Sequence, residues 1–136
     1  MILDCTLAFR SFQGSVGGER LKELLAVVDV GSGSARVALV SGEGEYAYFS
    51  SVRMSYSFPR ELMGVGMELD AEVLWRSIAS MINRSGMGGR VVGVGVTSQR
   101  YATVFTDREG RPVYAGPNTD ARGLTVQHLI IEKVGR

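Results

Sequence analysis

The chain has 136 residues, of which 45% are hydrophobic and 21% charged, a composition that fits one folded domain and excludes a disordered protein. Fifteen basic and fourteen acidic residues give a net charge of +1, so no strong field favours nucleic acid or an anionic membrane as a partner. The apolar runs are far shorter than the roughly 20 residues that a membrane-spanning helix needs, and a membrane protein is not expected.

Cysteine and histidine are each present once, as Cys5 and His128. These counts exclude an internal disulfide, a cysteine zinc cage and most histidine-dependent metal or nucleophile sites. His128 falls in a predicted helix and is expected to be structural or solvent-facing. Asp4 interrupts the short apolar stretch at the start, so no secretory signal is indicated and a cytoplasmic location is expected.

Residues 1–23 show no clear period and are interpreted as an N-terminal extension, with one short helix expected at 19–24. The run 24–30 is continuously apolar except for Asp29, which is typical of a central strand covered on both faces. Short glycine turns separate it from the next two runs. The first three strands are expected at 24–30, 35–40 and 45–55, and turns this short make them antiparallel neighbours.

Asp70 is the expected cap of a helix over 70–84, whose apolar positions recur at helical spacing and include Trp75, expected in the core. A buried fourth strand is predicted at 91–96, and a second helix from 119 or 120 to 134. Between them a strand at 101–106 and one at 112–114 form a hairpin. The order β-β-β-α-β, with a helix crossover to a parallel strand, predicts an α/β fold with a mixed sheet, the ribonuclease H-like order rather than a doubly wound nucleotide fold.

The turn after the first strand has the composition of an anion site. Ser32 and Ser34 supply hydroxyl donors, and glycines leave backbone N–H groups open to form a nest. Asp29 is a hard oxygen ligand for Mg²⁺, and Arg36 can reach a phosphate oxygen. The dinucleotide and Walker A fingerprints both fail here, because a strand follows and no lysine is present. A plain hairpin with a solvated Asp and Arg remains the alternative.

Four segments carry a resemblance to a known family. D-V-G-S-G-S-A-R at 29–36 resembles the first phosphate motif of the FGGY carbohydrate kinases, and 64–82 is similar to their acidic segment and following helix. V-T-S-Q-R at 96–100 is similar to their strand-end segment, and 104–122 resembles V-x-x-D-x-x-G-x-P followed by W-x-D-x-R. The four motifs keep their order and spacing over about 24–123.

The resemblance implies the fold of part of an actin-like ATPase domain, with residues 24–136 as an incomplete N-terminal kinase domain. It implies that ATP and Mg²⁺ serve a parent enzyme that phosphorylates a sugar or polyol. The implied phosphate end comprises Asp29, Gly31, Ser32, Gly33, Ser34 and Arg36, with Asp29 at the metal. The implied substrate residues are Gln99, Arg100, Tyr101, Asn118, Asp120 and Arg122.

Departures from the family pattern leave the substrate open. Gln99-Arg100-Tyr101 matches neither Q-R-E of glycerol kinases nor Q-M-H of xylulokinases, and Asn118 stands where the family has Trp. Two structural alternatives also stay open: Arg100 as a rim salt bridge and Asp120 as a helix cap.

No catalytic base can be nominated in this chain, because the family's Asp lies far downstream. The sequence is therefore interpreted as an N-terminal fragment without independent turnover, expected to form homo-oligomers or to need a missing C-terminal portion. The alternatives are a non-catalytic interaction module and a ribonuclease H-like nuclease, with Asp29 as the first metal ligand and Glu72 or Asp70 as a second on the helix.

Overall fold

A computed structural model describes residues 23–62 and 64–135. It divides into two compact units, one made by the chain up to Met54 with Glu72–Ser98, the other by Ser55–Ala71 with Gln99–Arg136. Each unit is described by itself. Most of the predicted N-terminal extension and of the short helix at 19–24 lies outside the described residues, and Leu24 begins a strand instead.

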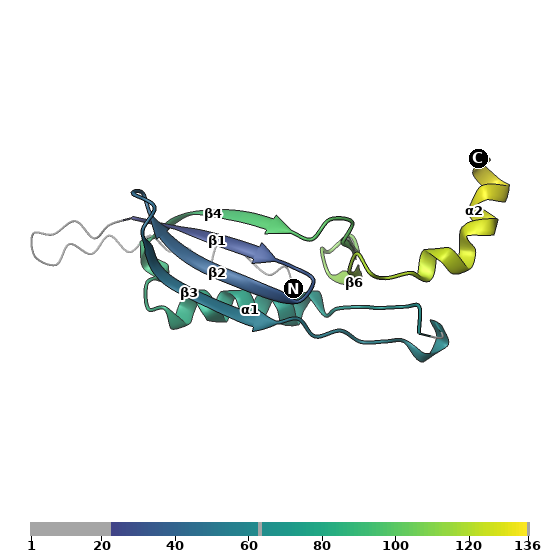
Figure 1. Cartoon of the computed structure of the whole chain (residues 1–136), viewed down its shortest axis with the longest axis horizontal. Coiled ribbons are helices and arrows are strands. Elements are labelled where there is room, and N and C mark those ends of the chain that lie inside the picture. The colour runs from purple at the N-terminus through teal and green to yellow at the C-terminus, as the bar shows by residue number, and fades with distance from the viewer. Residues whose placement is uncertain (1–22, 63, 136) are drawn as a thin grey trace, which may run out of the picture. The chain divides into compact units, whose positions relative to one another are not determined.

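The first unit is built on a four-stranded sheet of order β3-β2-β1-β4 (Figure 1). Strands β1 (Leu24–Val30), β2 (Ser34–Ser41) and β3 (Tyr46–Arg53) are antiparallel neighbours, as predicted. Strand β4 (Val91–Ser98) runs parallel to β1 and lies at the other edge. The predicted β-β-β-α-β order and mixed sheet are confirmed.

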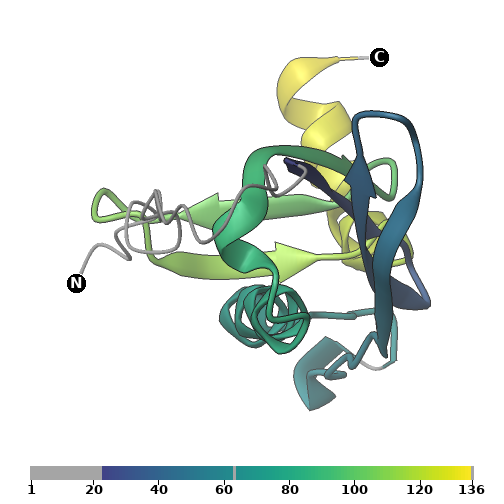
Figure 2. The same cartoon turned by 90° about the vertical axis from the view of Figure 1, so that its left-hand side faces the viewer.

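Helix α1 (Ala71–Arg84) begins directly after Asp70 and lies along one face of this sheet (Figures 1 and 2). It buries Ile78 and Met81 against alternate side chains of the strands, because successive strand residues point to opposite faces. A short 3-10 turn, η3 (Gly88–Arg90), leads from α1 into β4. The core of the unit consists of Leu24, Ala26, Val28, Ala35, Val37, Leu39, Ile78, Met81 and Val91.

Three burial predictions for this unit are wrong. Leu25 and Val27, between the core positions of β1, are 48% and 43% exposed, because α1 covers one face of the strand and not both. On β4 only Val91 is buried, since this edge strand pairs on one side with β1 and its valines beyond Val91 lie outside the core. Trp75 is 41% exposed on α1 and is not part of the core.

The second unit contains a 3-10 turn, η2 (Arg60–Leu62), the hairpin of β5 (Thr103–Thr106) and β6 (Pro112–Gly116), a 3-10 segment η4 (Arg122–Val126) and helix α2 (Gln127–Val134). The predicted hairpin is confirmed, with its strands side by side in Figure 2. The predicted second helix is correct only from Gln127, because Asp120 closes a turn and 3-10 structure precedes α2.

Helices long and apolar enough to cross a membrane are not found over the described ranges of the chain.

Candidate functional site

The candidate phosphate turn connects β1 to β2 in the first unit. Asp29 and Arg36 are directly paired in the antiparallel register, so their side chains emerge on the same face of the sheet. Their charged ends meet at 2.8 Å between Arg36 Nη1 and Asp29 Oδ2, and the side chain of Arg36 is 51% exposed and that of Asp29 37%. The two charged residues of the predicted motif are therefore brought together at an accessible ion pair.

Backbone hydrogen bonds hold the turn itself. The Gly31 amide donates to the Ser34 carbonyl at 3.0 Å, and Gly33 accepts from the Met54 amide at 3.0 Å. A Cβ on Gly31 would approach the Ser34 carbonyl to 3.3 Å, whereas one on Gly33 would meet nothing within 4 Å. The Gly31 N–H is thus used inside the turn, and the open side of the turn is at Gly33.

The geometry fits a single carboxylate ligand for Mg²⁺. No group of three His, Cys, Asp or Glu side chains that could hold a metal occurs among the residues that the structure describes. Mg²⁺ in nucleotide sites is commonly held by one or two carboxylates together with substrate phosphates. Asp29 at the strand end suits that mode of binding, and it does not suit a cage made by protein groups alone.

The predicted substrate residues belong to the second unit. Gln99 follows the end of β4 and accepts a hydrogen bond from the Asn118 amide at 3.4 Å through Oε1. Arg100 is exposed, and Tyr101 is 88% exposed with a φ of 62°. A positive φ is uncommon for a bulky residue, and such strain is often found at ligand sites. Gln99 and Asn118, 19 positions apart, are brought together.

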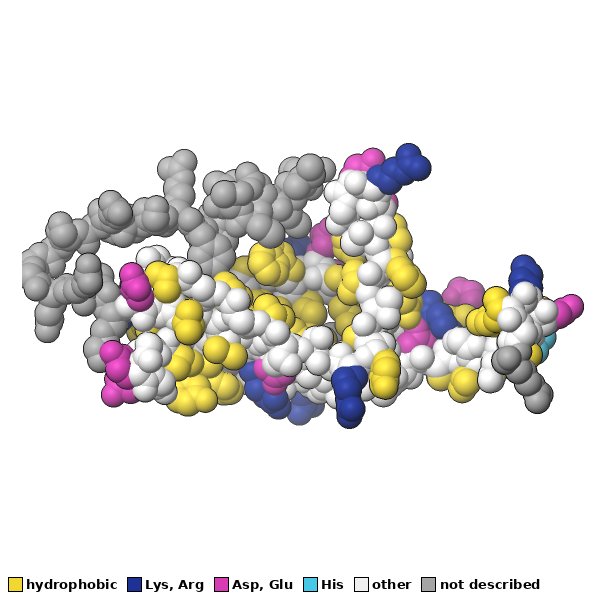
Figure 3. All heavy atoms as spheres, turned by 90° about the horizontal axis from the view of Figure 1, so that it is seen from above, with side chains coloured by type: hydrophobic (Ala, Val, Ile, Leu, Met, Phe, Trp, Pro, Cys, Tyr) yellow, Lys and Arg dark blue, Asp and Glu magenta, His cyan; other side chains and the backbone are white. Residues whose placement is uncertain are grey.

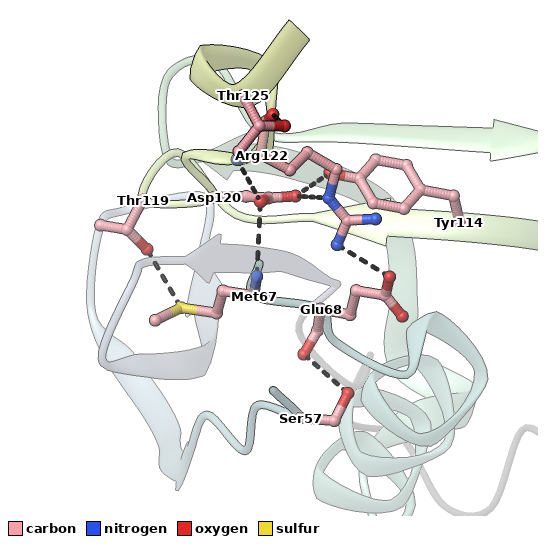
Figure 4. Close-up of polar contacts among 8 residues, drawn as sticks. All are labelled: Ser57, Met67, Glu68, Tyr114, Thr119, Asp120, Arg122 and Thr125. Carbon is pink, nitrogen blue, oxygen red and sulfur yellow. Dashed lines mark hydrogen bonds and ion pairs between the residues drawn. The ribbon is translucent and has the colours of Figure 1, made fainter. Parts of the chain in front are cut away.

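Asp120 and Arg122 lie in a polar cluster that also contains Glu68, Tyr114 and the Met67 amide (Figure 4). The Asp120 side chain is only 3% exposed, and its Oδ2 lies 2.6 Å from Arg122 Nε and accepts the Tyr114 hydroxyl. Its Oδ1 accepts from the amides of Arg122 at 3.1 Å and Met67 at 3.3 Å. The helix-cap alternative for Asp120 is not what the structure shows.

Arg122 completes the cluster from the other side. Its Nη2 lies 2.8 Å from Glu68 Oε1, and its guanidinium carbon lies 4.6 Å from the centre of the Tyr114 ring, in cation–π geometry. The Tyr114 ring in turn stacks on Phe105 of β5, with ring centres 5.6 Å apart. One guanidinium therefore serves two carboxylates and one aromatic ring.

The electrostatics of the cluster favour the ionised carboxylate and the neutral phenol. Burial raises the pKa of Asp120, but hydrogen bonds from the Tyr114 hydroxyl and from the Arg122 and Met67 amides outweigh it and hold that pKa below its ordinary value. Burial and the hydrogen bond to Asp120 raise the pKa of the Tyr114 hydroxyl. At neutral pH Tyr114 thus donates to a charged Asp120.

Two members of this cluster were not found by sequence reasoning. Glu68 lies in the acidic segment that the resemblance noted without assigning it a role, and Tyr114 was treated only as the end of a strand. An acidic residue in a loop and an arginine 54 positions later carry no spacing signal. Only the fold, by joining the two segments, reveals the pair.

Comparison with known proteins identifies the family. YoaC of Bacillus subtilis (strain 168), which carries the name of a sugar kinase, is 32% identical over 100 residues, covering 71% of this chain and 20% of YoaC. Glycerol kinase of Bacillus velezensis (strain DSM 23117) is 32% identical over 93 residues, covering 64% of this chain and 18% of the relative. The chain belongs to the FGGY carbohydrate kinases. It spans about a fifth of the length of these curated relatives.

Solved structures show the same fold. The crystal structure of Plasmodium falciparum glycerol kinase with ADP matches the FGGY chain with a TM-score of 0.65 at 17% identity, over 87% of this chain and 24% of that one. The likeness confirms the predicted fold, part of a ribonuclease H-like, actin-like ATPase domain. No family model matches the chain.

Proposed function

We propose that this FGGY chain forms part of the N-terminal domain of an ATP-dependent kinase that phosphorylates a hydroxyl of a sugar or polyol. The supporting observation is the Asp29–Arg36 pair at a glycine and serine turn, in a chain related to sugar and glycerol kinases. A carboxylate for Mg²⁺ beside a cation for phosphate oxygens is the pairing that phosphoryl transfer needs.

In this proposal each group has a defined task. Arg36 binds a phosphate oxygen of ATP, and Asp29 holds Mg²⁺ together with the phosphates, the ion neutralising charge on the transferred group when bound. The serine hydroxyls and the open backbone at Gly33 approach the nucleotide. Gln99, Arg100, Tyr101 and Asn118 contact substrate hydroxyls, and their departure from the glycerol and xylulose patterns leaves the sugar or polyol open.

Nucleotide binding by the chain tests the proposal. Calorimetry with ADP and MgCl₂ is expected to give binding that Asp29→Asn weakens about tenfold, through loss of the carboxylate, while leaving binding of ADP without Mg²⁺ nearly unchanged. Asp107→Asn, on the β5–β6 hairpin, is the matched control and should behave as wild type. Equal Mg²⁺ dependence in all three proteins would contradict the assignment of Asp29.

We expect no sugar phosphorylation by this chain alone, because it spans about a fifth of the length of its curated relatives and no catalytic base is nominated within it. An ADP-release assay across glycerol, xylulose, ribulose and related polyols measures this directly. Sugar-dependent turnover on the order of 1 s⁻¹, an ordinary enzyme rate, that co-purifies with the chain would overturn that expectation.

A further inference from the structure

The carboxylate of Asp120 makes most of its contacts inside the protein, which sets it apart from a carboxylate that binds a ligand. A carboxylate offers about four lone-pair sites. Asp120 accepts three hydrogen bonds, from two backbone amides and the Tyr114 hydroxyl, and its Oδ2 also forms an ion pair with Arg122 Nε. With its side chain 3% exposed and three hydrogen bonds accepted inside the protein, Asp120 is turned toward the protein interior and not toward a substrate hydroxyl.

These contacts join two segments about 50 residues apart in the sequence. The Met67 amide donates to Asp120, and Arg122 pairs with Glu68. Backbone hydrogen bonds reinforce the junction, from the Ala121 amide to the Val65 carbonyl at 2.9 Å and from the Leu69 amide to the Ala115 carbonyl at 3.0 Å. The cluster therefore holds residues 65–69 against residues 114–122 (Figure 4).

The same junction controls the turn that carries Asn118. The Asp120 amide donates to the Pro117 carbonyl at 3.1 Å, which closes a turn over residues 117–120. Gly116 and Pro117 are buried, whereas Asn118 is exposed and its amide reaches Gln99. The buried carboxylate thus fixes the turn, and the exposed residue two positions earlier is the one that can meet a ligand.

We infer that Asp120 is a positioning residue, which, with Arg122 and Glu68, locks the 117–120 turn so that Asn118 lies beside Gln99 without touching substrate itself. The inference rests on the proposed function insofar as Gln99 and Asn118 contact the sugar or polyol. It assigns Asp120 and Arg122 a role different from the substrate contact that the family resemblance implies.

Hydrogen exchange of single amides in the whole chain tests the lock independently of any kinase activity. In Asp120→Asn, exchange at the Leu69 and Ala121 amides is expected to accelerate at least tenfold, and the Asn118 amide signal to shift. Asp107→Asn is the matched control, because Asp107 also accepts two backbone amides and an arginine but joins residues only two and four apart. It should change exchange only within its own turn.

Glu68→Gln gives a milder variant that removes one ion pair at a half-buried position. It is expected to accelerate the Leu69 and Ala121 amides about threefold, and it keeps the inference testable if Asp120→Asn unfolds the unit. Wild-type exchange at both amides in Glu68→Gln, or changes in Asp120→Asn limited to residues 120–122, would overturn it.

Titration with glycerol or xylulose, followed at the Gln99 and Asn118 signals, separates positioning from direct contact. Binding weakened in both Asp120→Asn and Glu68→Gln, in proportion to faster exchange, supports positioning. Binding lost in Asp120→Asn with exchange at the wild-type rate would show direct contact and overturn the inference. If wild type binds neither polyol, the substrate assignment of the proposed function fails, and the exchange result decides the lock by itself.

Discussion

Asp120 and Asp107 are two carboxylates in the same unit that both accept backbone amides and face an arginine. Asp107 closes a tight turn at the tip of the β5–β6 hairpin, where the Arg111 amide and side chain lower its pKa. Asp120 instead joins distant segments and is nearly buried. In the sequence both are aspartates followed within four positions by the arginine that they face, and only the fold distinguishes a local turn from a long-range junction.

The first prediction concerns the pH dependence of the Asp120 junction. The folded-state pKa of Asp120 is depressed relative to an unfolded value of about 3.9. Its contribution to stability is therefore present above that pH and is lost as the pH falls through the folded-state pKa. In thermal unfolding, the gap in Tm between wild type and Asp120→Asn should narrow below about pH 4. A gap that stays constant into stronger acid would contradict this.

Tyr114 sets the alkaline limit of the same junction. Its pKa is raised above its ordinary value of about 10, so the stabilisation it supplies is complete below that value and is lost as the pH rises through the folded-state pKa. The ultraviolet titration of tyrosinate should show one late-titrating group that disappears in Tyr114→Phe. An unchanged set of titrating groups in that variant would count against the hydrogen bond to Asp120.

At the scale of elements, local sequence patterns predicted what depends on neighbours in the chain. Short glycine turns fixed the antiparallel order of β1, β2 and β3, and helical spacing gave α1 to within one residue of Asp70. The start of α2 was missed because the 3-10 segment η4 at Arg122–Val126 precedes the helix, and the apolar spacing did not distinguish the two. Strand β4 was wrongly predicted to be buried, because its apolar run does not reveal which faces other elements cover.

The second prediction tests the single covered face of the sheet. Leu39 is fully buried in the core under α1, so Leu39→Ala is expected to lower the free energy of unfolding by about 2–5 kcal/mol, the usual cost of a core cavity. Leu25→Ala removes the same atoms from a half-exposed site on the other face and should cost less than half as much. Urea titration measures both. Equal losses would indicate that the second face is also covered in solution.

The third prediction concerns the turn between β2 and β3. Gly44 has a φ of 85°, where an L side chain is strained, so Gly44→Ala should destabilise the first unit by about 1 kcal/mol. Gly42 in the same turn has no positive φ, and a Cβ there would meet nothing within 4 Å, so Gly42→Ala is a neutral control. Similar Tm values for the two variants would refute the role of the backbone angle.

At the scale of the whole molecule, the chain exposes many large apolar side chains. On α2 these include Ile130 and Val134, which are 53% and 76% exposed, and Figure 3 shows apolar side chains at the surface at its right-hand end, where α2 lies. Burying such side chains stabilises by about 1.5–3 kcal/mol each. The fourth prediction is therefore self-association at micromolar concentration, measured by light scattering.

A charged substitution on α2 provides the control for self-association. Ile130→Glu should shift the equilibrium toward the monomer because it replaces one exposed apolar side chain with a charge, whose burial in a contact is costly. A monodisperse monomer of wild type, with no tendency to aggregate, would contradict the prediction.

The site could be predicted only in part, because some of its residues are close in sequence and others meet only in the folded chain. Asp29 and Arg36 belong to one hairpin, so the sequence motif placed both residues at the same turn, and the strand register then pairs them. The Glu68–Arg122 pair depends on how a loop packs against a hairpin far along the chain. A local motif therefore contains both residues of the Asp29–Arg36 pair, whereas no local motif contains both residues of the Glu68–Arg122 pair.

The two faces of β1 differ in burial, and this difference should be measurable as a difference in tolerance to mutation. Because Leu24, Ala26 and Val28 are buried while Leu25 and Val27 are exposed, a saturation scan for folding of this chain should alternate between intolerant and tolerant positions along the strand. If the strand were covered on both faces, as its continuous apolar run suggested, every position would be intolerant. A scan of this one strand therefore measures whether its second face is in contact with protein or with water.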